Sequence, residues 1–312
     1  MKRLKVCFIG VGSIAKRHIR NLQTVCIERG IDLQMDAVRR AEAHSKIDNI
    51  YSVYSGVEQL PDDYDAIFIT NPTDLHLETL MTYHSKAKNF FIEKPVVSLR
   101  QLELAEHFKI RNNSVYYVAA PLRYNAVIQW VKQNVDKADV ISIRSISSSY
   151  LPDWRPGQDY RTTYSAHKDM GGGVSIDLIH EWDYLTYLFG WPEKVFSLVG
   201  KKSNLEIDSD DFAIYIAEFG DKIAELHLDY FGRKTIREIQ LITKDDTIVG
   251  DIANNRVHFL RSGKVIDFQE ERDDYQRREL IYFIDMILGS RNPEDGYHHG
   301  IEVLKLTQGI LR

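Results

Sequence analysis

Cysteine is scarce in this chain of 312 residues, which contains only Cys7 and Cys26. A scaffold of several disulfides is therefore excluded. Because both residues stand in apolar sequence, we expect reduced core thiols of a cytoplasmic protein, with a single disulfide as the alternative. Long apolar runs are also lacking, since the basic residues 1–5 lead into a run that reaches only Val11. We therefore expect no export signal, and no later stretch is long enough to span a bilayer.

An excess of one charge is missing as well. Lys and Arg together number 40 against 45 Asp and Glu, which gives a net charge of −5. This balance provides no general attraction to nucleic acid or to an anionic membrane, so we expect neither as a partner. The chain is 44% hydrophobic and 27% charged, a composition that favours globular cores over disorder. Its length favours two domains, with one large domain as the alternative.

The first part of the chain alternates short apolar runs with helix-like stretches. Strands are expected at 4–9, 33–38, 66–70, 89–92 and 115–119, with a weaker candidate at 50–54. Apolar residues recur at helical spacing between them, as in 14–28 and 74–86. This alternation predicts βαβ units, and hence an α/β domain with a doubly wound parallel sheet over residues 1–120.

The pattern changes after residue 120. Helices are expected at 125–135, 174–189, 273–288 and 301–311, and strands at 140–150, 194–199, 212–219, 223–230, 236–243, 247–252, 256–260 and 265–268. Consecutive strands joined by short turns favour antiparallel pairing. We therefore expect residues 121–312 to form a second α/β domain with a mainly antiparallel sheet.

A glycine pattern follows the first expected strand. Gly10-Val11-Gly12-Ser13-Ile14-Ala15 has the form G-x-G-x-x-A and leads into a helix. Gly10 would make the tight turn, Gly12 would let the backbone approach a pyrophosphate, and Ala15 would let helix and strand pack closely. The amides of the first helical turn would then face the phosphates. A glycine turn before a helix is common in α/β proteins, but its place in the βαβ pattern favours a dinucleotide-binding Rossmann fold.

The end of the second expected strand bears on the choice between NAD and NADP. An acidic residue there binds the ribose of NAD, and a basic one accommodates the extra phosphate of NADP. Arg39 and Arg40 follow Val38 at this end, so we slightly prefer NADP. The alternatives are an ordinary exposed basic turn, or Asp36 as the ribose acid if the strand ends earlier.

Two further motifs follow later strands of the first half. They are Thr70-Asn71-Pro72-Thr73-Asp74-Leu75-His76 and Glu93-Lys94-Pro95. In this order after the glycine pattern, they resemble the glucose-fructose oxidoreductase/inositol dehydrogenase/MocA family. Gly171-Gly172-Gly173, followed by Asp177, His180 and Asp183, looks like the substrate-domain helix of that family. The resemblance therefore covers essentially the whole chain. It implies that the mainly antiparallel sheet of residues 121–312 is open and that this domain serves substrate binding and oligomerisation.

The resemblance implies an enzyme, an NAD(P)-dependent dehydrogenase or reductase that acts on CH-OH groups. A hydride would pass between the nicotinamide and a hydroxyl-bearing carbon of a sugar, sugar nucleotide or cyclitol. Lys94 would lie near the nicotinamide ribose and the substrate hydroxyl. The residues that we assign to the cofactor are Gly10, Gly12, Ser13, Ile14, Ala15, Arg39, Arg40, Thr70, Asn71, Pro72, His76, Glu93 and Lys94.

Removal of a hydride from an alcohol requires a base for the hydroxyl proton. We prefer His180, since an ordinary histidine pKa of about 6.5 suits this task, and Lys94 is an equal candidate. Asp177 and Asp183 lie three residues before and after His180, on the same face of the expected helix, where one could orient the imidazole and the other contact substrate. The family pattern has its acid four residues before the histidine, which puts the role of Asp177 in doubt. The alternative is an ordinary salt-bridged helix. No metal site is expected in His180-Glu181-Trp182-Asp183-Tyr184, because the zinc motif H-E-x-x-H would require histidine at position 184.

A polar and aromatic loop over residues 152–161 precedes the glycine triplet. Its rings, carboxylates and arginines suit a polyhydroxylated ligand, with or without an anionic group. The loop resembles those of family members in acidic-sugar and surface-polysaccharide metabolism. The residues that we assign to the substrate are Arg123, Tyr124, Trp154, Arg155, Tyr160, Arg161, Asp177, His180 and Asp183. The alternative for each loop residue is a role in packing the loop itself.

Two other functions stay open: a non-catalytic nucleotide-binding sensor or regulator of the same fold, and a dihydrodiol or pigment reductase. Lys94 and His180 disfavour the first, and the polar loop disfavours the second. An open sheet would expose apolar residues such as Leu226, Leu228 and Tyr230, which favours pairing of subunits through that face. We therefore expect a homodimer or homotetramer.

Overall fold

The structure, a computed structural model, describes residues 2–39 and 47–311 and divides into two compact units. The first unit comprises residues up to Ala119 together with Arg272–Ile301. The second comprises Ala120–Glu271 together with Glu302–Arg312. The sequence division at residue 120 did not anticipate that residues 272–301 return to the first unit. Within the described ranges, no helix combines the length and the apolar character needed to cross a membrane.

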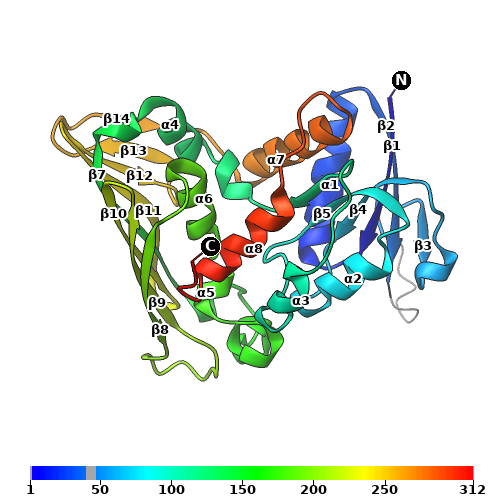
Figure 1. Cartoon of the computed structure of the whole chain (residues 1–312), viewed down its shortest axis with the longest axis horizontal. Helices are drawn as coiled ribbons and strands as arrows, with labels where there is room; N and C mark the ends of the chain where they lie inside the picture. The colour runs from blue at the N-terminus through cyan, green and yellow to red at the C-terminus, as the bar shows by residue number, and fades with distance from the viewer. Residues whose placement is uncertain (1, 40–46, 312) are drawn as a thin grey trace. The chain divides into compact units, whose positions relative to one another are not determined.

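In the described part of the chain, the first unit contains a six-stranded parallel sheet (Figure 1). Its strands, in spatial order, are β3 (Ser52–Tyr54), β2 (Ile31–Val38), β1 (Lys2–Ile9), β4 (Tyr64–Ile69), β5 (Ala87–Ile92) and β6 (Tyr116–Val118). The predicted doubly wound parallel sheet is confirmed. The strand order reverses between β1 and β4, so the carboxyl ends of these strands border the crevice in which open α/β sheets bind ligands.

Helices cover this sheet because its strands are apolar on both faces. The helices of the unit are α1 (Ser13–Glu28), α2 (His76–Thr82), α3 (Leu102–Glu106), α7 (Arg272–Ile287) and the beginning of α8 (Gly296–Leu306). Cys7 and Cys26 lie in its core as free thiols, as expected.

A cluster of phenylalanines explains why residues 272–301 belong to the first unit. Phe8, Phe68 and Phe91 stack across β1, β4 and β5, with ring centroids 4.6 and 4.8 Å apart. Phe283 of α7 meets Phe68 and Phe91 edge-on at 5.7 and 5.4 Å. Figure 1 shows α7 (orange) beside α1 (blue), so the last third of the chain supplies part of the first core.

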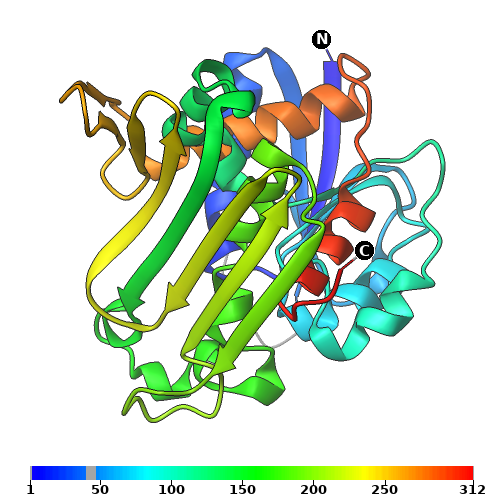
Figure 2. The same cartoon turned by 60° about the vertical axis from the view of Figure 1, so that its left-hand side comes forward.

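The sheet of the second unit is mainly antiparallel, as predicted. In spatial order, its strands are β14 (Val265–Asp267), β13 (Arg256–Phe259), β12 (Thr247–Asp251), β11 (Phe231–Thr243), β7 (Val140–Tyr150), β10 (Lys222–Asp229), β9 (Phe212–Phe219) and β8 (Lys194–Gly200). β7 and β10 pair in parallel, and the other neighbours pair antiparallel. Figure 2 shows the long strands of this sheet side by side. The helices on its inner face are α4 (Ala126–Asn134), α5 (Val174–Asp177) and α6 (His180–Phe189).

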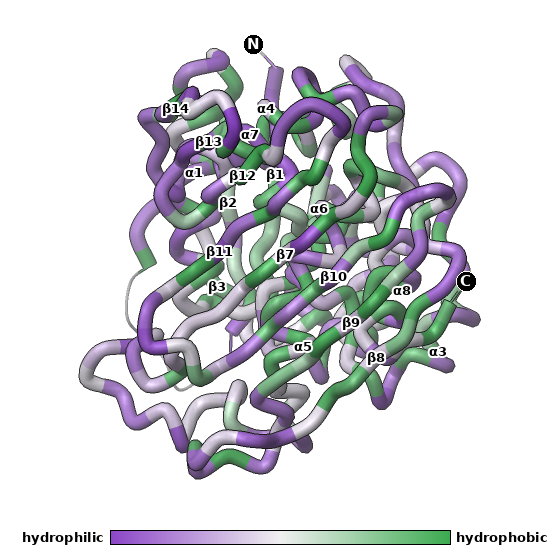
Figure 3. The backbone as a smooth tube through the Cα atoms, turned by 90° about the vertical axis from the view of Figure 1, so that its left-hand side faces the viewer, coloured by the Kyte–Doolittle hydropathy of each residue, from purple (hydrophilic) through white to green (hydrophobic). Residues whose placement is uncertain are grey.

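The outer face of this sheet presents different residues from those expected. Leu226, Leu228 and Tyr230 are 2%, 0% and 0% exposed, because their side of the sheet faces the helices. Along β10, the buried Ala224, Leu226 and Leu228 alternate with Glu225 and His227 on the other face, and Figure 3 shows this alternation of hydropathy along the strand. The exposed large apolar side chains of β8, β9 and β10 are Phe196, Leu198, Val199, Ile216 and Ile223.

Candidate functional site

The turn after β1 has the tight geometry that its glycine predicts. Gly10 has a φ of +86°, which disfavours any residue with a side chain. A Cβ atom there would lie 2.8 Å from the Cα atom of Asn71. The Gly10 amide donates a hydrogen bond to the Val38 carbonyl at 3.1 Å, and Thr70 Oγ1 donates to the Gly10 carbonyl at 2.7 Å. The turn is therefore fixed between the ends of β2 and β4.

The beginning of α1 fits a pyrophosphate. Gly12 is the N-cap residue, so no side chain caps the helix, and the first turn contains no acidic residue. The first-turn amides, including those of Ser13 and Ile14, therefore keep their N–H groups for an external acceptor, and the helix dipole favours an anion. A Cβ atom at Gly12 would meet nothing within 4 Å, which leaves room for a ligand. Ala15 is fully buried, as close packing of helix and strand requires.

The loop after β4 is held by its own side chains. Asn71 Nδ2 donates to Thr79 Oγ1 at 2.7 Å, whereas the buried Asn71 Oδ1 has no hydrogen-bond partner among the described residues. This orphaned acceptor is a second feature that suits a ligand in the crevice. His76 is 1% exposed, and its Nε2 and Nδ1 lie 3.0 Å from the carbonyl oxygens of Asn71 and Pro95. Burial lowers the pKa of His76, while Pro72 is exposed.

The loop after β5 places Lys94 at the carboxyl end of a central strand. Glu93 Oε1 lies 2.6 Å from Nε2 of His18, a buried residue of α1. The Lys94 amide donates to Glu93 Oε2 at 3.2 Å, and the Lys94–Pro95 peptide bond is cis. Burial alone would raise the pKa of Glu93, but the hydrogen bond from His18 and the nearby charges, that of Lys94 among them, lower it on balance. Glu93 is therefore a carboxylate at neutral pH.

The course of β2 excludes Asp36 as an acid that binds the ribose of NAD. The strand continues to Val38, and Asp36 within it is fully buried. The Asp36 carboxylate accepts hydrogen bonds from Tyr64 Oη at 2.7 Å and from the Ser52 amide at 3.0 Å. Asp36 is therefore a structural acid and does not stand at the strand end to meet a ribose. Arg39 follows the strand, and Arg40 lies outside the described residues.

The expected single helix over 174–189 is wrong. α5 ends at Asp177 and α6 begins at His180, because Leu178 leaves the helical conformation with φ −98° and ψ 29°. The spacing of three residues therefore does not place Asp177 and His180 on one face of a continuous helix. Asp183 does lie on α6 with His180, one turn further along.

Asp177 lies among phenols of the second unit. It is 5% exposed and accepts a hydrogen bond from Tyr230 Oη at 2.5 Å. The charge of Asp177 raises the pKa of Tyr164, and burial together with the same charge raises the pKa of Tyr230. Both phenols therefore stay protonated at neutral pH and act as hydrogen-bond donors.

The glycine triplet before α5 is required by close packing. Gly173 has a φ of +131°, and a Cβ atom there would lie 2.3 Å from Asp210 Oδ1. Asp210 Oδ2 accepts a hydrogen bond from the Ser175 amide at 2.8 Å, and burial raises the pKa of Asp210. Asp210 therefore anchors the beginning of α5, since its carbonyl oxygen also accepts the Val174 amide at 3.0 Å.

Two residues assigned to the substrate pair with each other. Arg123 donates from Nε to Asp183 Oδ2 at 2.8 Å and from its terminal nitrogen to Asp183 Oδ1 at 2.6 Å. Both side chains are mostly buried, at 14% and 13% exposure. This bidentate pair links the turn Pro121–Tyr124, which contains Tyr124, to α6.

The loop over residues 151–170 consists of short 3-10 turns, at Leu151–Asp153, Tyr160–Thr162, Tyr164–Ala166 and Lys168–Met170. Trp154 donates from Nε1 to Ser149 Oγ at 2.9 Å and packs edge-on against the Tyr230 ring at 5.2 Å. The Arg155 guanidinium lies 5.4 Å from the centre of the Tyr164 ring. A small pocket opens within the loop, lined by Leu151, Pro152, Trp154, Arg155, Gln158, Tyr160, Thr163 and Ser165.

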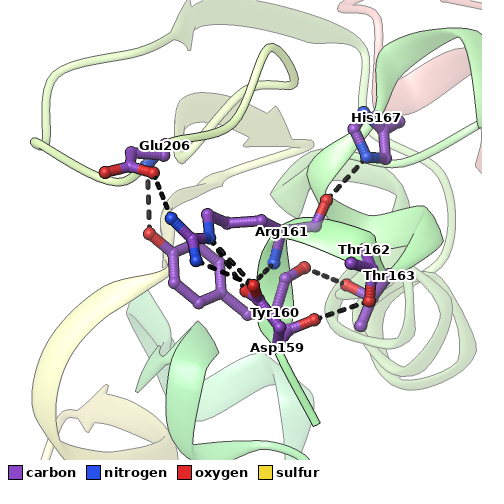
Figure 4. Close-up of polar contacts among 7 residues, drawn as sticks. All are labelled: Asp159, Tyr160, Arg161, Thr162, Thr163, His167 and Glu206. Atoms are coloured by element: carbon purple, nitrogen blue, oxygen red, sulfur yellow. Dashed lines mark hydrogen bonds and ion pairs between the residues drawn. The ribbon is translucent and has the colours of Figure 1, made fainter.

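The guanidinium group of Arg161 pairs with neighbouring carboxylates (Figure 4). Its guanidinium donates to Asp159 at 2.8–3.0 Å and to Glu206 Oε2 at 2.7 Å. The Tyr160 hydroxyl accepts a hydrogen bond from the Glu206 amide at 3.2 Å, and His167 Nε2 lies 2.7 Å from the Arg161 carbonyl oxygen. These contacts fix the loop, and two carboxylates compensate the charge of Arg161.

Sequence reasoning missed the phenols and the acid around Asp177. Tyr230 was expected on the outer face of the sheet, and Asp210 was not singled out, although the acidic run Asp208-Ser209-Asp210-Asp211 is visible in the sequence. The acidic run itself was the available signal, whereas its position beside the beginning of α5, 35 residues away in sequence, results from folding. Among the described residues, no cluster of His, Cys, Asp and Glu is arranged to hold a metal ion.

Comparison with known proteins gives curated relatives over part of the chain. The oxidoreductase YrbE of Bacillus subtilis is 26% identical over 194 residues, which is 61% of this chain and 54% of YrbE. The chain thus spans about half the length of the curated relatives that it matches.

Solved structures share the fold over nearly the whole chain. The myo-inositol 2-dehydrogenase of Lactobacillus plantarum aligns with a TM-score of 0.76 and 20% identity over 98% of this chain and 96% of its own. A levoglucosan dehydrogenase in complex with NADH and levoglucosan aligns with a TM-score of 0.82 and 15% identity over 99% and 96%. At these identities the likeness establishes the fold.

Family models match both parts of the sequence. The model described as an oxidoreductase family with an NAD-binding Rossmann fold matches residues 4–119, and the model of the GFO/IDH/MocA C-terminal domain matches residues 128–248. The glycine turn, the uncapped α1 and the reversal of strand order agree with the first of these. The chain therefore belongs to the GFO/IDH/MocA oxidoreductase family, and its N-terminal part is that family's NAD-binding Rossmann fold.

Proposed function

We propose that this protein is an NAD(P)-dependent dehydrogenase or reductase that acts on a hydroxyl-bearing carbon of a sugar, sugar nucleotide or cyclitol. The observation that carries the proposal is the uncapped N-terminus of α1 behind the Gly10 turn, with Lys94 at the end of β5 in the same unit. The named substrates of the two structural neighbours, myo-inositol and levoglucosan, support a carbohydrate-like substrate.

The residues of the first unit hold the cofactor. The amides at the beginning of α1 bind the pyrophosphate, and the loops after β4 and β5 border the same crevice. When bound, the nicotinamide accepts or donates a hydride. Lys94 binds the nicotinamide ribose and the substrate hydroxyl through its ammonium group.

The residues of the second unit receive the substrate. His180 holds the hydroxyl proton at an imidazole nitrogen, with Lys94 as the other candidate for this role. The Asp177 carboxylate orients substrate together with the protonated phenols of Tyr230 and Tyr164. Trp154 and Arg155 offer a ring face and a positive charge to the sugar and its substituents.

NADP(H) is the preferred cofactor in this proposal, with NAD(H) also accepted. The carboxylate of Asp36 is buried and bound to Tyr64, so no acid from within β2 repels the extra phosphate. Arg39 follows the strand at the position that meets the adenosine ribose. Relative kcat/KM for the two cofactors tests this preference.

The cytoplasm is the proposed location. Both cysteines are free and buried in the first unit, as in proteins of a reducing compartment. Fractionation of the cells that make this protein tests the location, and recovery outside the cytoplasm would contradict it.

A screen of sugars, sugar nucleotides and cyclitols with each nicotinamide cofactor tests the function. The change in nicotinamide absorbance reports turnover. Lys94→Ala and His180→Ala are expected to reduce kcat by at least about 100-fold, and His180→Ala should leave cofactor affinity unchanged. Full activity in either variant would remove that residue from the mechanism, and the absence of cofactor binding would contradict the function itself.

A further inference from the structure

We infer that a closed ring of contacts ties the Lys94 loop to the phosphate-binding turn, and that His76, Glu93 and His18 are positioning residues for Lys94. The inference rests on the proposed function, because it concerns how the lysine is presented to the nicotinamide end of the cofactor. All residues of this ring of contacts lie in the first unit.

The first arc of the ring joins the glycine turn to the loop after β4. Thr70 donates through Oγ1 to the carbonyl oxygens of Gly10 and Ile9, at 2.7 and 3.2 Å. Asn71 packs so closely on Gly10 that a Cβ atom there would lie 2.8 Å from both its Cα and its Cβ. The turn and the beginning of this loop therefore move as one piece.

The second arc joins the loop after β4 to the loop after β5. The His76 ring lies between two backbone carbonyls, with Nε2 3.0 Å from the Asn71 oxygen and Nδ1 3.0 Å from the Pro95 oxygen. Because burial lowers the pKa of His76, the neutral imidazole donates a hydrogen bond to one of these oxygens and contacts the other through its second nitrogen. The ring is 1% exposed, so water cannot replace these partners. His76 thus contacts backbone on both sides, and its buried ring holds the cofactor loop rather than presenting a side chain to a ligand.

The third set of contacts joins the loop after β5 to α1 and so completes the ring of contacts. Glu93 accepts at Oε1 a hydrogen bond from Nε2 of His18, which lies two turns into the phosphate-binding helix and is 1% exposed. Through Oε2, the same carboxylate accepts the Lys94 amide at 3.2 Å. One buried acid therefore connects the helix to the backbone of the lysine.

The consequence is that Lys94 is held from both sides. Its preceding residue is fixed to α1 by His18, and its following residue is fixed to Asn71 by His76. The pyrophosphate amides and the lysine thus share one rigid frame, which sets their spacing before any ligand binds.

Differential ligand binding tests this inference. NADH reaches both ends of the frame, whereas ADP carries two phosphates without the second ribose and the nicotinamide. His76→Leu removes the N–H with which the imidazole donates to one backbone carbonyl, and His76→Gln retains an amide donor. We expect His76→Leu to raise the Kd for NADH by about tenfold, as loss of one well-placed contact would, while the Kd for ADP stays within about twofold. His76→Gln should recover part of the NADH affinity.

His84→Leu is the matched control. His84 belongs to the same unit, lies outside the ring and contacts the Tyr116 hydroxyl through Nε2 at 2.6 Å. His84→Leu should lower thermal stability, and it should change the Kd values of the two ligands by the same factor. Equal weakening of NADH and ADP binding in His76→Leu, or the same difference between the two ligands in His84→Leu, would overturn the inference. Failure of the unmodified protein to bind ADP would instead contradict the cofactor site, and the inference with it.

Discussion

The carboxyl group of Glu93 makes the free energy of unfolding depend on pH. Burial alone would raise its pKa, but the hydrogen bond from His18 and neighbouring positive charge bring it below its ordinary value of 4.5. A carboxyl whose pKa is lowered by folding stabilises the native state above its unfolded pKa, and this contribution is lost as pH falls through the folded pKa.

We therefore expect the free energy of unfolding of the wild type to fall more steeply with acid than that of Glu93→Gln. Urea unfolding from about pH 6 down to about pH 3 measures both slopes, in the range where carboxyl groups titrate. Parallel slopes for the two proteins would show that the Glu93 pKa is the same in the folded and unfolded states.

Single residues were predictable where their chemistry depends on near neighbours in sequence. Gly10 and Ala15 stand where the glycine pattern placed them, with the expected turn and burial. Asp36 and Asp177 were not predictable, because their partners Tyr64 and Tyr230 lie 28 and 53 residues away. A carboxylate that could bind a ligand and one that holds a buried phenol look identical in a sequence.

Among the elements, α7 contributes most clearly to a core distant in sequence. Phe283 is 1% exposed and meets two stacked rings of the parallel sheet. Phe283→Ala is expected to destabilise the first unit by about 3–5 kcal/mol, the cost of a large cavity in a packed core. Chemical denaturation measures this loss.

Leu104→Ala serves as the comparison for Phe283→Ala. Leu104 lies on α3 of the same unit and is 59% exposed, so its truncation should change stability by less than about 0.5 kcal/mol. A similar loss in both variants would mean that Phe283 is not part of the first core.

The boundaries of elements were predictable only where local signals agree with packing. The strand at 140–150 forms over the predicted residues, between short 3-10 helices at Lys137–Asp139 and Leu151–Asp153. α8 begins at Gly296, five residues before its expected start, because Gly296 fits against the Tyr116 backbone, where a Cβ atom would lie 2.6 Å from the carbonyl oxygen. Such close approaches arise from tertiary packing, which overrides helix propensity.

At the scale of the whole molecule, we expect a homodimer or homotetramer formed through the outer face of the second sheet. Phe196, Leu198, Ile216 and Ile223 are 64%, 62%, 46% and 47% exposed there. Ile216→Lys should shift sedimentation toward the monomer, because a buried unpaired charge disfavours the interface. Met81→Lys, at a 53% exposed position of α2, should leave the assembly unchanged. A wild-type monomer at micromolar concentration would contradict the expectation.

The fold class was readable from the rhythm of apolar runs, since alternation of strands and helices and then consecutive strands each lead to few architectures. The inward face of β10 was readable but was assigned wrongly. Leu226 and Leu228 alternate with Glu225 and His227, a pattern that places the two leucines on the buried face, where the structure has them. The return of residues 272–301 to the first unit was not readable, because Phe283 looks like any apolar helix residue.

The interrupted course of the chain through its two units affects how the protein matures during synthesis. The parallel sheet leaves the ribosome early, but Phe68 and Phe91 lack their edge-on partner until α7 has been translated. The second unit also lacks a core contact until late in synthesis, since the Tyr215 hydroxyl donates to the carbonyl of Thr307 at 2.7 Å. Each core is thus completed only by a segment near the end of the nascent polypeptide, residues 272–301 for the first unit and residues after 301 for the second.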